Sequence, residues 1–162
     1  MQIITTTATF TRPSDTTQYT SGDLVANSTT AGSVSPMTFK IPSGRGIKLH
    51  RVELLRSSTT VTDGQFRFHL YKDSPTPANG DNSAWSTTAS GYQGYIDIDG
   101  QTPAFTDDSK ASGVPVSNSV FVPMFIYTDA DQTLYGLLEA RDTYTPTSAE
   151  VFTMTLLGES YV

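Results

Sequence analysis

The acidic residues of the central region are the side chains whose spacing comes closest to a chemical site. Asp97 and Asp99 share one side of a short alternating segment, and Asp107 and Asp108 follow it. Two carboxylates at a suitable separation can hydrolyse a glycosidic bond, and a cluster of carboxylates can bind Ca²⁺. The run 97–100 is only a fragment of a calcium loop, because the third acid and the distal Glu do not follow in place. We therefore predict a solvated acidic loop.

The two histidines and the absence of cysteine limit the other routes to catalysis. His50 and His69 each lie in a predicted strand and could be cross-strand neighbours, but no further metal ligand follows at a telling spacing. Without cysteine, thiol nucleophiles and thiolate metal sites are excluded. The chain also lacks a G-x-S-x-G motif and the glycine-rich phosphate loops. These patterns predict that the protein is not an enzyme and has no catalytic, metal-binding or cofactor-binding residues.

Three aromatic residues in a segment rich in Gly, Ser and Asn are the best indication of a binding surface. They are Trp85, Tyr92 and Tyr95. Exposed aromatic rings can stack on sugars or anchor a protein interface. Equally, these rings could fold back and cover the open end of a β-sandwich. The sequence leaves both interpretations open.

Strands must position these side chains, because period-2 alternation dominates the chain and Thr is abundant. Strands are predicted over residues 8–10, 37–41, 47–56, 66–71, 95–99, 120–128, 134–141 and 151–157. The run 147–150 fits a helix capping box, but the alternation after it predicts a turn into a strand. The pattern predicts an all-β fold of two packed antiparallel sheets. A jelly roll is the first choice, and a Greek-key or immunoglobulin-like sandwich is the alternative.

Three local features refine this prediction. The alternation changes phase near Arg51, which predicts a bulge or a strand that crosses between layers. Asp63-Gly64 is typical of a hairpin turn. Pro123 removes a donor from the ladder, so its strand is expected at a sheet edge or with a bulge.

The length of 162 residues suits one domain. We predict an extended N-terminal arm over 1–35 and a β-sandwich over 36–162, with a long central loop region over 73–117. An extended arm could add a strand to a neighbour's sheet.

The charge pattern bears on partners. The net charge is −6, so attraction of the whole molecule to nucleic acid or to an anionic membrane is not expected. No segment has the roughly 20 apolar residues that a membrane span needs. Basic residues gather in 40–72 and acidic residues in 73–110. This asymmetry predicts either two solvated faces or a basic sheet face that meets an acidic partner.

Three stretches carry a resemblance to a known family. They are the segments 10–27, 81–85, which comes soon after a predicted strand, and 144–152. Together they resemble a family of small proteins encoded among the virion genes of tailed bacteriophages and prophages. The resemblance runs over most of the chain in the same order, and the central segment 86–117 matches least.

The resemblance implies a virion structural protein of the capsid decoration or cement type. Such a protein would be β-rich, form a homodimer or homotrimer, and bind the major capsid protein on the outer capsid surface after assembly in the bacterial host cytoplasm. The alternative is a head-fibre or tail-fibre module, a lectin-like adhesin for a host glycan. The residues predicted at the partner interface are Phe10, Arg12, Pro13, Tyr19, Trp85 and Tyr92. Arg12 and Tyr19 could instead fasten the arm to its own domain.

Overall fold

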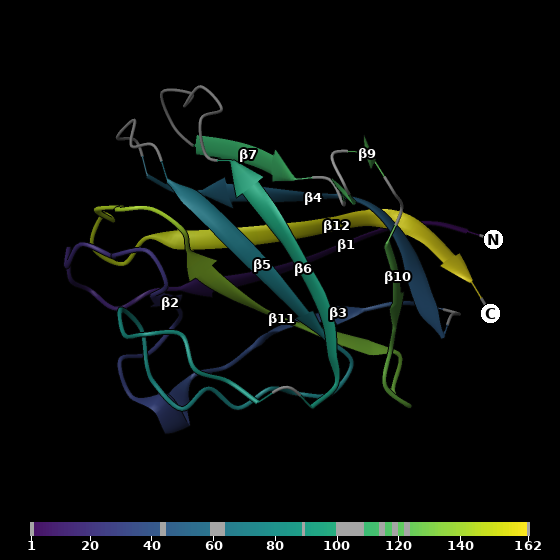
Figure 1. The fold of residues 1–162 in the computed structure, drawn as a ribbon, viewed down its shortest axis with the longest axis horizontal. Helices are drawn as coiled ribbons and strands as arrows, with labels where there is room; N and C mark the ends of the chain where they lie inside the picture. Colours follow the sequence, from purple (N-terminus) through teal and green to yellow (C-terminus); the bar gives the residue numbers. More distant parts are fainter. Residues whose placement is uncertain are drawn as a thin grey trace.

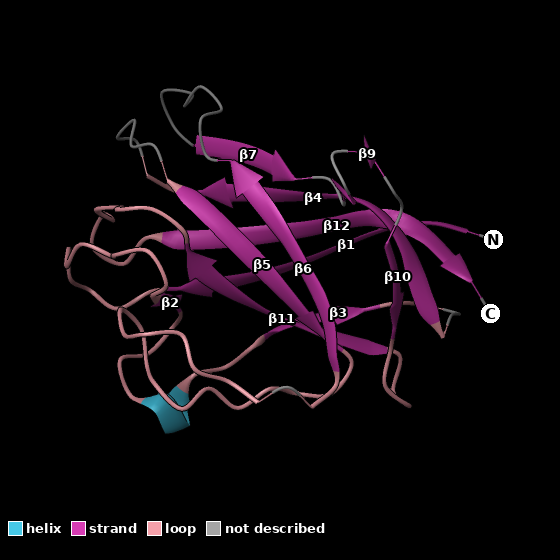
Figure 2. Ribbon diagram, in the orientation of Figure 1, coloured by secondary structure: helices cyan, strands magenta, loops and turns pink. Residues whose placement is uncertain are grey.

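The computed structural model describes residues 2–42, 45–58, 64–88, 90–99, 109–113, 116–117, 120–121 and 124–161. The strands are β1 (Gln2–Thr11), β2 (Leu24–Val25), β3 (Met37–Lys40), β4 (Gly46–Arg56), β5 (Gln65–Tyr71), β6 (Tyr92–Asp99), β7 (Ser109–Gly113), β8 (Val116–Ser117), β9 (Val120–Phe121), β10 (Met124–Tyr127), β11 (Thr133–Ala140) and β12 (Val151–Tyr161). Within the described residues, the only helical segment is the 3₁₀ turn η1 (Ala31–Ser33), shown in Figure 2. No helix there has the length and apolar character that crossing a membrane requires.

Ten of the strands form two antiparallel sheets that pack face to face (Figure 1), and β8 and β9 pair with each other. The first sheet has the order β1-β12-β4, with β10 also paired to β4. The second has the order β6-β5-β11, with β2 and β3 both paired to β11. β7 pairs with β4 and, at one residue pair, with β6, so hydrogen bonds connect the sheets at that side. The predicted all-β sandwich is confirmed, whereas the choice between a jelly roll and a Greek-key sandwich stays a prediction.

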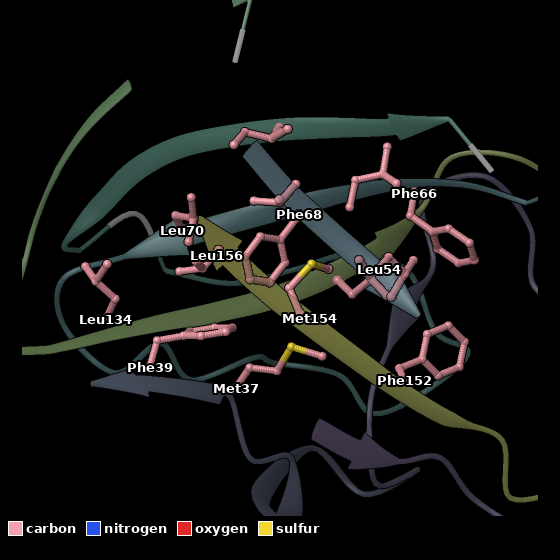
Figure 3. Packing of buried hydrophobic residues seen from close by; sticks show 14 of the residues in the cluster. Met37, Phe39, Leu54, Phe66, Phe68, Leu70, Leu134, Phe152, Met154 and Leu156 are labelled. Atoms are coloured by element: carbon pink, nitrogen blue, oxygen red, sulfur yellow. The ribbon is translucent and has the colours of Figure 1, made fainter. Parts of the chain in front are cut away.

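The core lies between the two sheets and follows the predicted alternation. Phe66, Phe68 and Leu70 of β5 are buried, and Met154 and Leu156 of β12 face them from the other sheet (Figure 3). Each large apolar side chain buried in this way contributes about 1.5–3 kcal/mol. The alternation therefore correctly identified the faces that hold the two sheets together.

The irregularity predicted near Arg51 is present in the ladder between β4 and β12. Leu157 pairs with Arg51 but the next residue, Gly158, pairs with Leu49, so His50 has no partner in the register. A side chain at position 158 would meet the Lys48 carbonyl oxygen at 2.4 Å, which explains the glycine. The bulge allows both halves of β4 to bury their apolar residues in spite of the phase change.

The N-terminal segment is part of the sandwich, which corrects the prediction that residues 1–35 form an extended arm outside it. β1 pairs with β12 along ten residues, and β2 joins β11 within the second sheet. On the outer face of β1, Thr7 and Thr9 hydrogen-bond to Thr155 and Thr153, each at 3.0 Å. The sequence shows little apolar alternation here because one side of β1 carries hydroxyls. Pairing with β12, which is distant in the sequence, holds the segment as a strand.

The central region contains more strand than the predicted loop over 73–117. β6 begins at Tyr92, earlier than expected, and β7 and β8 lie within the same region. The predicted strand 120–128 is described as β9 and β10. Asp63, Pro123, Asp107 and Asp108 lie outside the described residues, so the predictions made for them stay predictions.

The turn predicted before the last strand is confirmed. The Thr147 backbone N–H donates to Glu150 Oε2 at 3.1 Å, and β12 starts at the next residue. The capping-box pattern therefore closes a turn and does not start a helix.

Candidate functional site

The outer face of the second sheet presents exposed tyrosines because of a bulge in β6. Tyr71 pairs with Tyr92, but the neighbouring Leu70 pairs with Gly94, so Gln93 is skipped in the register. This skip leaves both Tyr92 and Tyr95 on the outer face, where they are 39% and 48% exposed. Gly94 has φ +125°, and a Cβ there would lie 2.4 Å from Met124 Cε. The backbone of the bulge therefore requires glycine at this position.

Trp85 reaches the same face from the loop that follows β5. The Trp85 N–H donates to the Gly22 carbonyl at 2.6 Å, and the indole stacks on His69 with ring centroids 4.0 Å apart. A small second core of Leu24, Ala26, Tyr71 and Leu137 lies here, and Trp85 packs against it. Trp85 therefore folds back over the sheet and is half-buried, in contrast with the two tyrosines.

His69 occupies the centre of this surface and is buried. Its Nε2 lies 2.7 Å from Glu139 Oε2, and its Nδ1 lies 3.2 Å from the Tyr92 hydroxyl. An ionised Glu139 can only accept, so Nε2–H donates to it and the Tyr92 hydroxyl donates to Nδ1. Arg141 Nη1 binds the other oxygen of Glu139 at 2.8 Å. His50 lies on β4 in the other sheet, so the two histidines are not cross-strand neighbours.

The pKa of His69 makes stability depend on pH. Burial lowers this pKa below the ordinary value of 6.5, and Glu139 opposes the effect only in part. The unfolded chain therefore binds a proton at a higher pH than the folded chain does. We expect the melting temperature to fall as the pH is lowered from 6.5 towards the folded-state pKa of His69. Calorimetry across this range would measure it.

Two single variants test whether His69 causes this pH dependence of stability. His69→Gln should flatten the acid-side loss of stability, whereas His50→Gln should keep it. An unchanged pH profile in His69→Gln would contradict the assignment.

Next to this histidine, an ion pair fixes one of the exposed rings. Arg67 donates to both Asp97 oxygens, at 2.6 and 2.9 Å, and its guanidinium lies 3.7 Å from the centre of the Tyr95 ring. The hydrogen bond to Asp97 raises the pKa of Arg67. The carboxylate considered for acid chemistry is therefore the partner of an arginine in a surface ion pair. The Asp99 side chain lies outside the described residues.

Two hollows lie on this outer face. One has a volume of about 270 Å³ and contains the Arg67–Asp97 pair. The other, which we name the aromatic groove, has a volume of about 260 Å³. It is lined by His69, Tyr71, Trp85, Thr87, Thr88 and Tyr92. Two of the predicted interface residues, Trp85 and Tyr92, therefore come together in one groove.

Arg12 and Tyr19 do not belong to a surface, which corrects their prediction as interface residues. Arg12 is 2% exposed and Tyr19 is 0% exposed. Arg12 Nε donates to the Tyr19 hydroxyl at 2.9 Å, and its Nη2 lies 3.2 Å from Asp81 Oδ2. The Tyr19 hydroxyl and the Ala26 N–H both donate to Asp81 Oδ1 at 2.7 Å. Both side chains fasten the N-terminal segment to its own domain, because a buried carboxylate needs this set of donors.

The segment 144–152, the third of the stretches that carry the resemblance, contacts the network around Arg12 and Tyr19. The Arg12 N–H donates to the Glu150 carbonyl at 3.0 Å, and the Tyr19 N–H donates to the Tyr144 carbonyl at 2.8 Å. The rings of Tyr19 and Tyr144 stack with centroids 6.1 Å apart, and the Tyr144 hydroxyl donates to Glu150 Oε2. The three stretches therefore interlock in the framework of the fold.

The remaining predicted interface residues keep partial exposure. Phe10 stacks on Phe152 with ring centroids 5.4 Å apart, and Pro13 is half-buried. Among the described residues, no three side chains of the metal-ligating types gather closely enough to hold an ion. Neither a model of a known protein family nor a curated protein sequence matches this chain.

Proposed function

We propose that this chain is a structural protein of a bacteriophage virion that binds the outer capsid surface as a decoration or cement protein. The observation that carries the proposal is a set of exposed aromatic side chains on two strands, one from each sheet. We name this set the aromatic edge: Tyr92 and Tyr95 of β6, and Phe125 and Tyr127 of β10. The sequence resemblance to phage virion proteins supplies the class of partner.

The aromatic edge has the composition of a protein interface. Phe125 and Tyr127 are 58% and 55% exposed. β6 and β10 belong to different sheets but approach each other here, because the Tyr127 backbone N–H donates to the Gln93 side chain at 3.3 Å. Aromatic residues and Arg are enriched where proteins bind one another, and Arg67 lies over Tyr95. A protein surface is therefore the favoured partner of this edge.

The edge is also pre-formed, which favours tight binding. The Arg67–Asp97 pair holds Tyr95, and the hydrogen bond to His69 holds Tyr92. Rings fixed before binding lose less conformational entropy when a partner covers them. On a capsid, a homodimer or homotrimer would engage several copies of the major capsid protein at once, so modest single contacts would add up to strong attachment.

The test measures binding to capsids purified without the protein. The double variant Tyr95→Ala/Phe125→Ala should sediment with capsids with an affinity at least about tenfold below that of the unsubstituted protein, since the loss of one aromatic hot-spot residue costs about 2 kcal/mol or more. Ile3→Ala is the matched control, because Ile3 is 84% exposed but lies on β1, which is not part of the aromatic edge. Equal binding by the double variant, or purified virions that lack the protein, would refute the proposal.

A further inference from the structure

The outer edge of β1 has backbone groups without partners. β1 is the outer strand of the first sheet (Figure 1), and within the described residues it pairs with β12 alone. The Arg12 N–H donates to the Glu150 carbonyl at 3.0 Å, so these residues form a hydrogen-bonded pair that continues the same ladder. Hydrogen-bonded and non-hydrogen-bonded pairs alternate along an antiparallel ladder. The even-numbered residues of β1 therefore bind β12, and the odd-numbered residues direct their N–H and C=O groups away from it.

Side-chain contacts of β1 agree with this assignment. The hydroxyls of Thr7 and Thr155 lie 3.0 Å apart, and those of Thr9 and Thr153 lie equally close. Side chains approach most closely in non-hydrogen-bonded pairs, as expected for these odd-numbered residues. In the part of the chain that the structure describes, no backbone hydrogen bond reaches the outer side of four of them. These residues, with unpaired donors and acceptors, are Thr5, Thr7, Thr9 and Thr11.

The same stretch of β1 leaves part of the sandwich interior uncovered. Ile4 points inward and is 5% exposed, whereas Ala8 and Phe10, which point the same way, are only partly buried. A strand added beside residues 5–11 would cover both of these apolar side chains further. Ile3 lies beyond this stretch. The open part of the edge is therefore residues 5–11.

β1 also lacks the features that keep edge strands from pairing. Its ten residues include no charged residue, no Pro and no Gly, and its ladder with β12 has no bulge. Proteins commonly protect an exposed edge with charges, Pro or a bulge. β6, the outer strand of the second sheet, has both Asp97 and a bulge. A regular, uncharged edge such as β1 is suited to pairing with another strand.

We infer that two copies of this chain form a dimer by antiparallel pairing of residues 5–11 of β1 across a two-fold axis. The strand is neutral, so two copies meet without like charges opposite one another. Odd-numbered residues of one copy lie opposite odd-numbered residues of the other, so each donor faces an acceptor. The two strands exchange about eight hydrogen bonds, which is within the range of a typical protein interface.

This pairing selects a dimer over a trimer. The contact uses the same edge of both copies, so it is isologous and closes after two subunits. The first sheets of the two copies then form one continuous sheet. The interface goes beyond the proposed capsid role, which leaves the dimer and the trimer open.

Sedimentation velocity measures the dimer directly, and the unsubstituted protein should have twice the 17.5 kDa mass of one chain. Thr7→Pro removes an outward N–H and leaves the hydrogen bonds to β12 in place, a position where an edge strand tolerates Pro. It should raise the dissociation constant of the dimer at least about fivefold, because the symmetric interface loses one hydrogen bond from each copy. Thr7→Ala is the matched control: it loses the same hydroxyl contact with Thr155 but keeps the N–H, so it should dimerise normally.

The absence of cysteine allows a second test that needs no proline. Single cysteines are introduced at Thr5, Thr7, Thr9 and Thr11, and the variants are oxidised alone and mixed in pairs. Residues of a hydrogen-bonded antiparallel pair have Cα atoms about 5.5 Å apart, which suits a disulfide. Thr7→Cys should cross-link fastest with Thr9→Cys, and Thr5→Cys with Thr11→Cys. Thr76→Cys, in an exposed loop outside β1, is the control for random collision.

Four results would overturn the inference: the mass of one chain at every concentration, the mass of a trimer, an unchanged dissociation constant in Thr7→Pro, or no preference for the two expected cysteine pairs. The capsid-binding variant Tyr95→Ala/Phe125→Ala changes no residue of β1, so it should keep the dimer mass. Failure of the dimer and failure of the capsid role are therefore distinguishable.

Discussion

Replacing Arg12 with alanine is expected to lower the free energy of unfolding by about 3–5 kcal/mol. The Arg12 and Asp81 side chains are both 0% exposed, and the substitution would leave the carboxylate buried without its cation. Burial already raises the pKa of Asp81, and Arg12 opposes that rise. The Tyr19 hydroxyl would lose one hydrogen-bond partner as well. Urea denaturation followed by circular dichroism measures the change.

An exposed ion pair gives the matched comparison. Arg51 lies 2.7 Å from Glu53 and its side chain is 47% exposed, so Arg51→Ala should cost less than about 1 kcal/mol. The double variant Arg12→Ala/Asp81→Ala should be less destabilised than the sum of the two single variants, since it removes the stranded charge. If Arg12→Ala and Arg51→Ala cost the same, the buried network does not hold the N-terminal segment.

Phe68→Ala is expected to destabilise the fold by about 3–5 kcal/mol. Phe68 is fully buried between the sheets, and its ring meets Phe39 edge to face with centroids 5.9 Å apart (Figure 3). The ring also packs on Gly136, where a Cβ would lie 2.2 Å from a ring carbon. Rigid strands on both sides prevent collapse of the space, so the variant keeps a cavity. Thermal and urea unfolding both measure the loss.

The control for this cavity is a large apolar residue in water. Ile3→Ala removes a side chain that is 84% exposed, and it should change the free energy of unfolding by less than about 0.5 kcal/mol. A loss below about 1 kcal/mol in Phe68→Ala would show that neighbouring side chains fill the space.

The framework and the proposed binding surface occupy different parts of the sequence. The stretches that carry the resemblance meet in the network around Arg12, Tyr19 and Asp81, where burial leaves little surface for a partner. Tyr92 and Tyr95 lie in the segment 86–117, outside these stretches.

Among the candidate side chains, the aromatic residues of the binding surface could be predicted from the sequence, whereas the polar residues that position them could not. Trp85, Tyr92 and Tyr95 stood out in a Gly-rich segment, and Trp85 and Tyr92 line the aromatic groove. The importance of His69 and Glu139 could not be predicted, because they are 70 residues apart and their pairing depends on the register of β5 and β11. The bulge at Gln93 left no signal except the glycine that follows it.

The alternation of apolar and polar residues was sufficient to predict an all-β sandwich and its core, because a strand with one buried face must repeat every two residues. It was not sufficient to predict β1, whose threonine-rich segment forms a strand by pairing with β12 at the far end of the chain. Nor could it show that Arg12 binds Asp81 across 69 residues. Such pairings join residues that are close only in the folded chain, so local sequence patterns cannot predict them.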